Sequence, residues 1–77
     1  MNPTQLAQSF NDLETVTNYM TRMEAIVNRE QKYIAAHGAS NDANPDKQWE
    51  MYKETAQFHL DTWDALKARR DQLKAEK

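Results

Sequence analysis

Side chains that are mostly large and apolar recur in the second half of the chain at alternating separations of three and four residues. The positions that follow this pattern are Trp49, Tyr52, Ala56, His59, Trp63, Leu66, Arg70 and Leu73. This spacing places the side chains on one side of an α-helix, because the helix completes a turn every ~3.6 residues. Such a helix buries its apolar side against another helix. The pattern therefore predicts a long helix that packs on a helical partner.

The first half of the chain repeats apolar residues every seven positions. The repeat consists of Leu6, Leu13, Met20, Val27 and Ile34, with Val16 and Met23 at the companion positions three residues further on. Ser9 and Glu30 interrupt the companion row. This half therefore predicts a bundle helix rather than a strict zipper.

Capping signals set the expected ends of both helices. Asn2 followed by Pro3 and Gln5 is typical of a helix start, and we expect the first helix to span residues 3 to 37. His37 and Gly38 predict its end, with Gly38 in the left-handed conformation. A loop over residues 38 to 44 then leads to Pro45 and a second helix over residues 45 to 75.

A short loop between two long helices favours an antiparallel arrangement. We therefore predict an all-α fold, a single domain over residues 1 to 77 that forms a coiled-coil-like antiparallel helical hairpin. In the expected register, Asp12 approaches Arg70 and Lys32 approaches Glu50. The predicted hairpin core consists of Leu6, Leu13, Val16, Met20, Met23, Val27, Ile34, Trp49, Tyr52, Ala56, Trp63, Leu66 and Leu73.

Several large apolar residues lie outside the seam between the two predicted helices. They are Phe10, Tyr19, Ile26, Tyr33, Met51 and Phe58. Scattered exposed apolar residues are common on proteins and explain part of such a set. A second buried face explains all of it, so we expect these residues to form a protein interface. Two hairpins would close into a four-helix bundle, a homodimer, or the hairpin would dock on another protein.

Composition narrows the classes of protein. The chain has 77 residues, no Cys, 10 Lys and Arg and 12 Asp and Glu, for a net charge of −2. Disulfides are therefore excluded, and no broad charge attraction to nucleic acid or an anionic membrane is expected. No basic segment followed by an apolar run opens the chain, and no apolar run is as long as a membrane span. We expect a soluble cytoplasmic protein, with leaderless export or incorporation into an assembly as open alternatives.

Candidate chemistry is sparse. The carboxylates of Glu54, Asp61 and Asp64 match solvated helix faces, and no Glu-x-x-His pairing for a metal is present. We therefore expect no enzymatic activity, no catalytic residue, no cofactor, no metal and no small-molecule substrate. His59 lies within the apolar pattern, where it is either a pH-sensitive layer of the interface or a structural residue bonded to a neighbour. His37 is expected to act only as a helix-end residue.

The C-terminal part of the chain is basic. The residues concerned are Lys67, Arg69, Arg70, Lys74 and Lys77. Five phosphate contacts would make binding to a nucleic acid strongly salt-dependent. Asp61, Asp64, Asp71 and Glu76 interleave this cluster, and basic helix ends are common, so nucleic-acid binding is the third-ranked hypothesis.

The expected function is that of a non-enzymatic protein–protein interaction module, such as a small accessory, inhibitor or chaperone-like factor. The first alternative is a small structural subunit of a virion or secretion apparatus. Two helices joined by a polar turn that ends in Asn44-Pro45 resemble the needle subunits and small chaperones of bacterial secretion systems, and are similar to the hairpin dimers that regulate plasmid RNA. These resemblances imply a helical hairpin and carry no functional residue.

Overall fold

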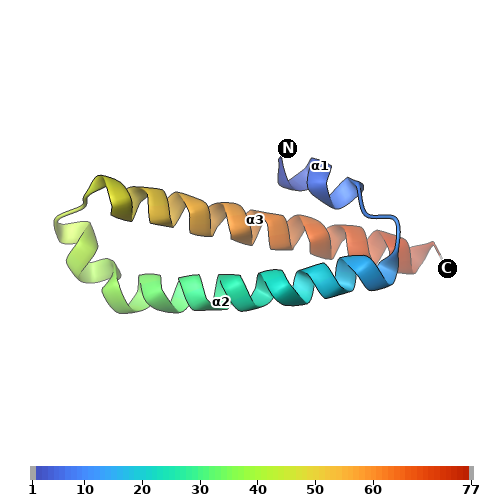
Figure 1. The fold of residues 1–77 in the computed structure, drawn as a ribbon, viewed down its shortest axis with the longest axis horizontal. Coiled ribbons are helices and arrows are strands. Elements are labelled where there is room, and N and C mark those ends of the chain that lie inside the picture. Colours follow the sequence, from blue (N-terminus) through green and yellow to red (C-terminus); the bar gives the residue numbers. More distant parts are fainter. Residues whose placement is uncertain (1, 77) are drawn as a thin grey trace.

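Three helices make up the secondary structure of this protein. The computed structural model describes residues 2–76, and within them the helices are α1 (Pro3–Gln8), α2 (Leu13–Ala43) and α3 (Lys47–Ala75), with no strand. The long helices α2 and α3 run side by side in opposite directions over a length of about 50 Å (Figure 1). The predicted all-α class and the packing of two long helices are confirmed, and the predicted homodimer stays a prediction.

The seam between α2 and α3 buries one side of each helix. The buried apolar residues on these two helices are Val16, Met20, Met23, Val27, Trp49, Ala56, Leu66 and Leu73. Other predicted core residues are half-buried, namely Leu6, Leu13, Ile34, Tyr52 and Trp63. Three buried residues lie outside the predicted core, and they are Ala7, Glu30 and Thr62. Polar groups are therefore part of the interior of this hairpin.

The expectation of one continuous helix over residues 3 to 37 is wrong, because the chain leaves the helix after Gln8 and re-enters it at Leu13. Asp12 is the N-cap of α2, and its carboxylate accepts hydrogen bonds from the Thr15 amide at 2.9 Å and the Thr15 hydroxyl at 2.8 Å. The Ser9 hydroxyl donates to the carbonyl of Leu6 at the end of α1. Short polar side chains that bond to the nearby backbone compete with the helix, so they favour this break.

Gly38 does not end the helix. It lies inside α2, which continues to Ala43, and no described residue has a positive φ. The connection is therefore residues 44–46 rather than 38–44, and Asp46 caps α3 by accepting from the Trp49 amide at 2.8 Å. The expected start of the second helix at Pro45 is wrong by two residues, because α3 begins at Lys47. Asp46, rather than Asn44, supplies the capping oxygen.

The shift of the connection changes the register of the hairpin. The predicted turn centres near residue 41, whereas the observed connection centres on Pro45. Across the seam, Glu30 consequently faces His59. The predicted charge pairs are replaced, since Arg70 contacts Asp71 at 3.4 Å and Glu50 contacts Lys53 at 3.4 Å.

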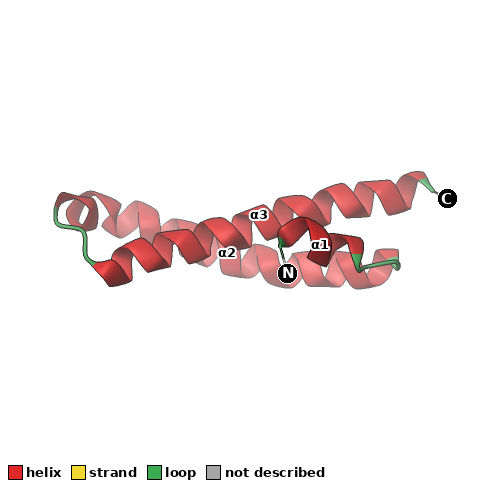
Figure 2. Ribbon diagram, turned by 90° about the horizontal axis from the view of Figure 1, so that it is seen from above, coloured by secondary structure: helices red, strands yellow, loops and turns green. Residues whose placement is uncertain are grey.

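The short helix α1 lies against the C-terminal half of α3, on the half of the hairpin opposite the α2–α3 connection (Figure 1). A view from above also shows α1 beside this half only (Figure 2). The Arg69 guanidinium donates to the carbonyl of Phe10 at 2.8 Å and to the Asn11 side chain at 3.2 Å, which ties the α1–α2 connection to α3. A buried cluster forms at this end from Ala7, Val16, Met20, Leu66 and Leu73. The molecule therefore has three helices at this α1 end and two at the opposite loop end.

Candidate protein-interaction surface

Two of the six predicted interface residues pack inside the molecule. Phe10 and Tyr19 are half-buried, their ring centroids are 5.3 Å apart, and both pack on the buried cluster at the α1 end. The break before α2 brings Phe10 into this position, and the sequence pattern gave no account of that break. Contacts within the chain thus already cover much of these two side chains.

Tyr33 belongs to an aromatic group near the loop end. Its ring centroid lies 5.1 Å from Tyr52, 6.4 Å from Trp49 and 4.4 Å from His37. The ring is nevertheless 47% exposed. Ile26, which we also expected in the interface, is half-buried. Tyr33 therefore lies at the edge of the hairpin seam in contact with α3, and the predicted interface role of both residues stays a prediction.

Met51 and Phe58 are the large apolar residues on the outer side of α3. Met51 is 61% exposed and Phe58 is 48% exposed, and they lie seven residues apart, two turns along the same side of the helix. A shallow hollow of about 340 Å³ opens beside Met51 and is lined by Glu30, Gln48, Tyr52 and Thr55 as well. Further along α3, Thr62 is buried and Ala65 is partly buried at the α1 end. The exposed part of this side of α3 is therefore the part that α1 leaves uncovered.

A carboxylate and an imidazole meet across the seam behind this surface. Glu30 Oε1 and His59 Nδ1 are 2.7 Å apart, and the Glu30 side chain is 9% exposed while that of His59 is 27% exposed. Because a carboxylate only accepts hydrogen bonds, the imidazole Nδ1 is the donor. The distance is typical of a charge-assisted hydrogen bond. The sequence left two interpretations of His59 open, a pH-sensitive layer of the interface and a structural residue bonded to a neighbour. Glu30 is the bonded neighbour that the second interpretation requires.

A polar network holds the loop end. Asp42 Oδ1 accepts from Trp49 Nε1 at 2.7 Å and from Lys53 Nζ at 2.9 Å. The hydrogen bond from Trp49, followed by that from Lys53, holds the pKa of Asp42 below its usual value of 3.8. The hydrogen bond to Asp42 in turn raises the pKa of Lys53 above 10.5. Trp49 and Lys53 on α3 are thereby joined to the last turn of α2.

The basic residues near the end of α3 contact groups of the same chain. Arg69 is bonded to the α1–α2 connection, Arg70 contacts Asp71, and the Lys67 ammonium lies 5.6 Å from the centroid of the Trp63 ring. Lys74 is exposed, and Lys77 lies outside the described residues. Three residues of the predicted phosphate-binding cluster, Lys67, Arg69 and Arg70, are therefore already engaged in contacts within the chain.

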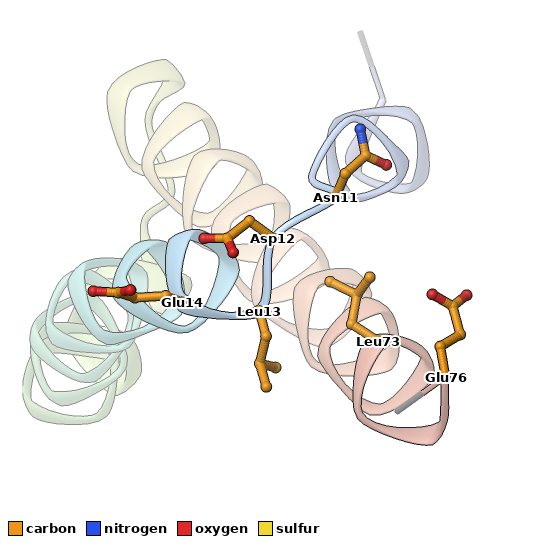
Figure 3. A pocket seen from close by; sticks show the side chains of 6 residues that line it. All are labelled: Asn11, Asp12, Leu13, Glu14, Leu73 and Glu76. Atoms are coloured by element: carbon orange, nitrogen blue, oxygen red, sulfur yellow. The ribbon is translucent and has the colours of Figure 1, made fainter.

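A hollow of about 520 Å³ lies at the α1 end. It is lined by Asn11, Asp12, Leu13, Glu14, Leu73 and Glu76. Seen from close by, the carboxylates of Asp12 and Glu14 point to one side and that of Glu76 lies apart from them, so the three do not converge on a common centre (Figure 3). Across residues 2–76, no group of three or more His, Asp or Glu side chains is placed to hold a metal ion. The hollow therefore lacks the convergent polar groups of a ligand site.

Comparison of the chain with protein-family models, with curated proteins and with solved structures finds no match. Within the described part of the chain, no helix combines the length and the apolar character that a bilayer crossing requires. The candidate interaction surface is therefore the exposed side of α3 around Met51 and Phe58.

Proposed function

We propose that this protein is a non-enzymatic protein–protein interaction module that binds through the outer side of α3. The observation that carries this proposal is the exposure of Met51 and Phe58 on the part of α3 that α1 leaves uncovered. The same helix accepts α1 along its C-terminal half, where Ala65 packs on the cluster that contains Ala7. A helix face that already packs a helix over half its length is suited to pack another over the rest.

The exposed apolar area is large enough to matter for binding. A Phe or Met side chain offers roughly 200 Å², so exposures of 48% and 61% leave about 100 Å² on each of Phe58 and Met51. At about 25 cal/mol per Å², covering each side chain contributes about 2.5 kcal/mol before the costs of association. A free-energy contribution of this size is typical of a hot-spot residue in a protein–protein interface.

The substitution Phe58→Asp tests the proposal. It places a charge in the centre of the apolar surface, and we expect the helical circular dichroism to persist while self-association or partner binding is lost. Ala68→Asp is the matched control, because it adds the same charge at another exposed position of α3. Sedimentation and binding curves that are the same for Phe58→Asp and for the unmodified chain would refute the proposal.

A structural subunit of a larger assembly is the second candidate function. It is favoured by a specific feature, the opposite charge of the outer sides of α2 and α3 described below. Such a subunit forms polymers that grow with concentration, whereas an interaction module of the homodimer kind stops at two copies. Mass photometry over a concentration series distinguishes the two.

A further inference from the structure

The outer side of α2 carries a basic row. We call Arg22, Ala25, Arg29, Lys32 and Ala36 the α2 stripe; all five residues are exposed. At about 100° per residue, this stripe lies roughly 160° around the axis from the buried residues Met20, Met23 and Val27. Within residues 2–76, none of its three cations is paired with a carboxylate. No Asp or Glu stands three or four residues from any of them in the sequence, so the helix itself supplies no counter-charge.

The outer side of α3 carries an acidic and apolar row with the same spacing. We call Met51, Glu54, Phe58 and Asp61 the α3 stripe; all four residues are exposed. Glu54 has no ion-pair partner in the described part of the chain, and Asp61 accepts only from Gln57 at 2.9 Å. Their charged neighbours three or four residues away are acidic as well. Like charges at these spacings destabilise a helix slightly, and an external cation removes that cost.

The two stripes match when the helices that carry them cross in opposite directions at Ala25 and Phe58, at an angle that takes the N-terminal part of α2 past the side of α1, which packs on α3 around Ala65. Aligning Ala25 with Phe58 places the small side chain opposite the large one. The same register sets Arg22 opposite Asp61 and Arg29 opposite Glu54, three and four residues to either side. Lys32 then lies beside Met51, where its alkyl stem covers the thioether and its ammonium reaches the Glu50 and Glu54 side of the helix. All of the apolar and charged groups of the α3 stripe thereby find a complementary group.

We propose that the occupant of the α3 stripe is the α2 stripe of a second copy of this chain. The inference rests on the proposed function, since it names the partner of the same α3 surface, and within that function it favours the second candidate, a subunit of a larger assembly, over a closed homodimer. Opposite charges across the contact favour this partner and its register over other apolar helices.

The position of the stripes also determines the kind of assembly. By the 100° spacing, each stripe lies on the side of its helix away from the buried seam residues, so the two stripes occupy opposite edges of the α2–α3 pair. One copy therefore offers its α3 stripe at one edge and its α2 stripe at the other. A contact between two different surfaces that does not close on itself repeats, and the copies form an open row. A closed four-helix bundle would instead use neighbouring sides of the helices.

Two single charge reversals and their mixture test the inference. Arg29→Glu makes the α2 stripe repel an unmodified α3 stripe, and Glu54→Arg makes the α3 stripe repel an unmodified α2 stripe. We expect each variant alone to need about ten times the concentration of the unmodified chain for half-assembly. In an equimolar mixture, every contact between the two variants is complementary, so assembly is restored to within about threefold of the unmodified chain. Lys74→Glu is the control for Arg29→Glu, because it makes the same change of charge at an exposed position outside both stripes.

Sedimentation velocity with Phe58→Asp in parallel separates the possible results. Loss of assembly for each reversal with recovery in the mixture supports the inference. A mass that stops at two copies, or an unmodified chain that stays monomeric at every concentration, overturns it. If the reversals change nothing while Phe58→Asp abolishes association, the inference fails and the proposed function stands. If Phe58→Asp changes neither association nor binding to any protein partner, both fail.

Discussion

The hydrogen bond between Glu30 and His59 gives the sharpest test of how the hairpin is held together. Glu30 is 6% exposed, and His59 is its ion-pair or hydrogen-bond partner in the described residues. In the variant His59→Leu, the carboxylate stays buried and loses its donor. The removed imidazole is replaced by an apolar group of similar volume, so packing changes little.

The expected loss of stability follows from this geometry. Breaking a buried pair by removing one partner costs about 3–5 kcal/mol when both groups are enclosed. The His59 side chain is 27% exposed, so water reaches the vacated side of the carboxylate and the loss falls to about 2 kcal/mol. A chain of 77 residues unfolds with an entropy of roughly 160 cal/mol/K, so the melting temperature should fall by about 12 °C.

Urea unfolding followed by circular dichroism measures this loss, at a concentration where the sample is monomeric. The control is the double variant Glu30→Leu with His59→Leu, which replaces both polar groups by apolar ones. We expect its stability to return to within about 1 kcal/mol of the unmodified chain, because the unpaired carboxylate is gone. A double variant less stable than His59→Leu alone would refute the reasoning. So would a cost for His59→Leu below about 0.5 kcal/mol, the scale of an exposed pair.

Three further predictions concern the seam and the loop end. Gly38→Ala should raise the free energy of unfolding by about 0.5–1 kcal/mol in a urea titration, because Gly38 is helical and its nearest neighbour to a new Cβ is Asp42 Oδ2 at 4.0 Å; a lower stability would contradict a helical Gly38. Leu66→Ala should lower it by about 2–5 kcal/mol, because Leu66 is fully buried, and a loss below 1 kcal/mol would mean that the site is not packed. Because the folded pKa of Asp42 lies below 3.8, its contribution is present above about pH 4 and is lost as the pH falls through the folded value. The fluorescence of Trp49, read in a Trp63→Phe background, should therefore change in acid, and Asp42→Asn should abolish that change.

The fold was predictable from spacing because both long helices repeat apolar residues on one side. The break at residues 9–12 was not, since Leu6 and Leu13 continue the seven-residue repeat across it. The signal that would have shown it is Asp12, which like Asn2 is a preferred N-cap residue and here accepts from the Thr15 amide. Periodicity shows which side of a helix is apolar, but it does not show whether the helix is continuous.

The candidate site was predictable only in part. Exposure of Met51 and Phe58 follows from their position off the seam. Phe10, by contrast, packs on the buried cluster at the α1 end, and the sequence pattern did not predict this contact. Glu30 interrupts the apolar pattern of the first long helix and His59 that of the second. Two polar interruptions indicate a buried pair when they lie opposite each other across the seam. Which residues lie opposite each other depends on the register, and because the turn was predicted too early in the chain, the Glu30–His59 pair was not predicted.

The uneven thickness of the hairpin sets where it opens. The buried cluster of Ala7, Val16, Met20, Leu66 and Leu73 lies where three helices meet, while the loop end is held by the aromatic group around Trp49 and by the two side-chain hydrogen bonds to Asp42. Local unfolding begins where the fewest apolar groups are enclosed. Opening of the hairpin therefore starts beside residues 44–46, so the backbone amides of Asn44, Asp46 and the helix turns next to them exchange with deuterium before those of the buried cluster. A peptide tag inserted there would leave the tightly packed end untouched.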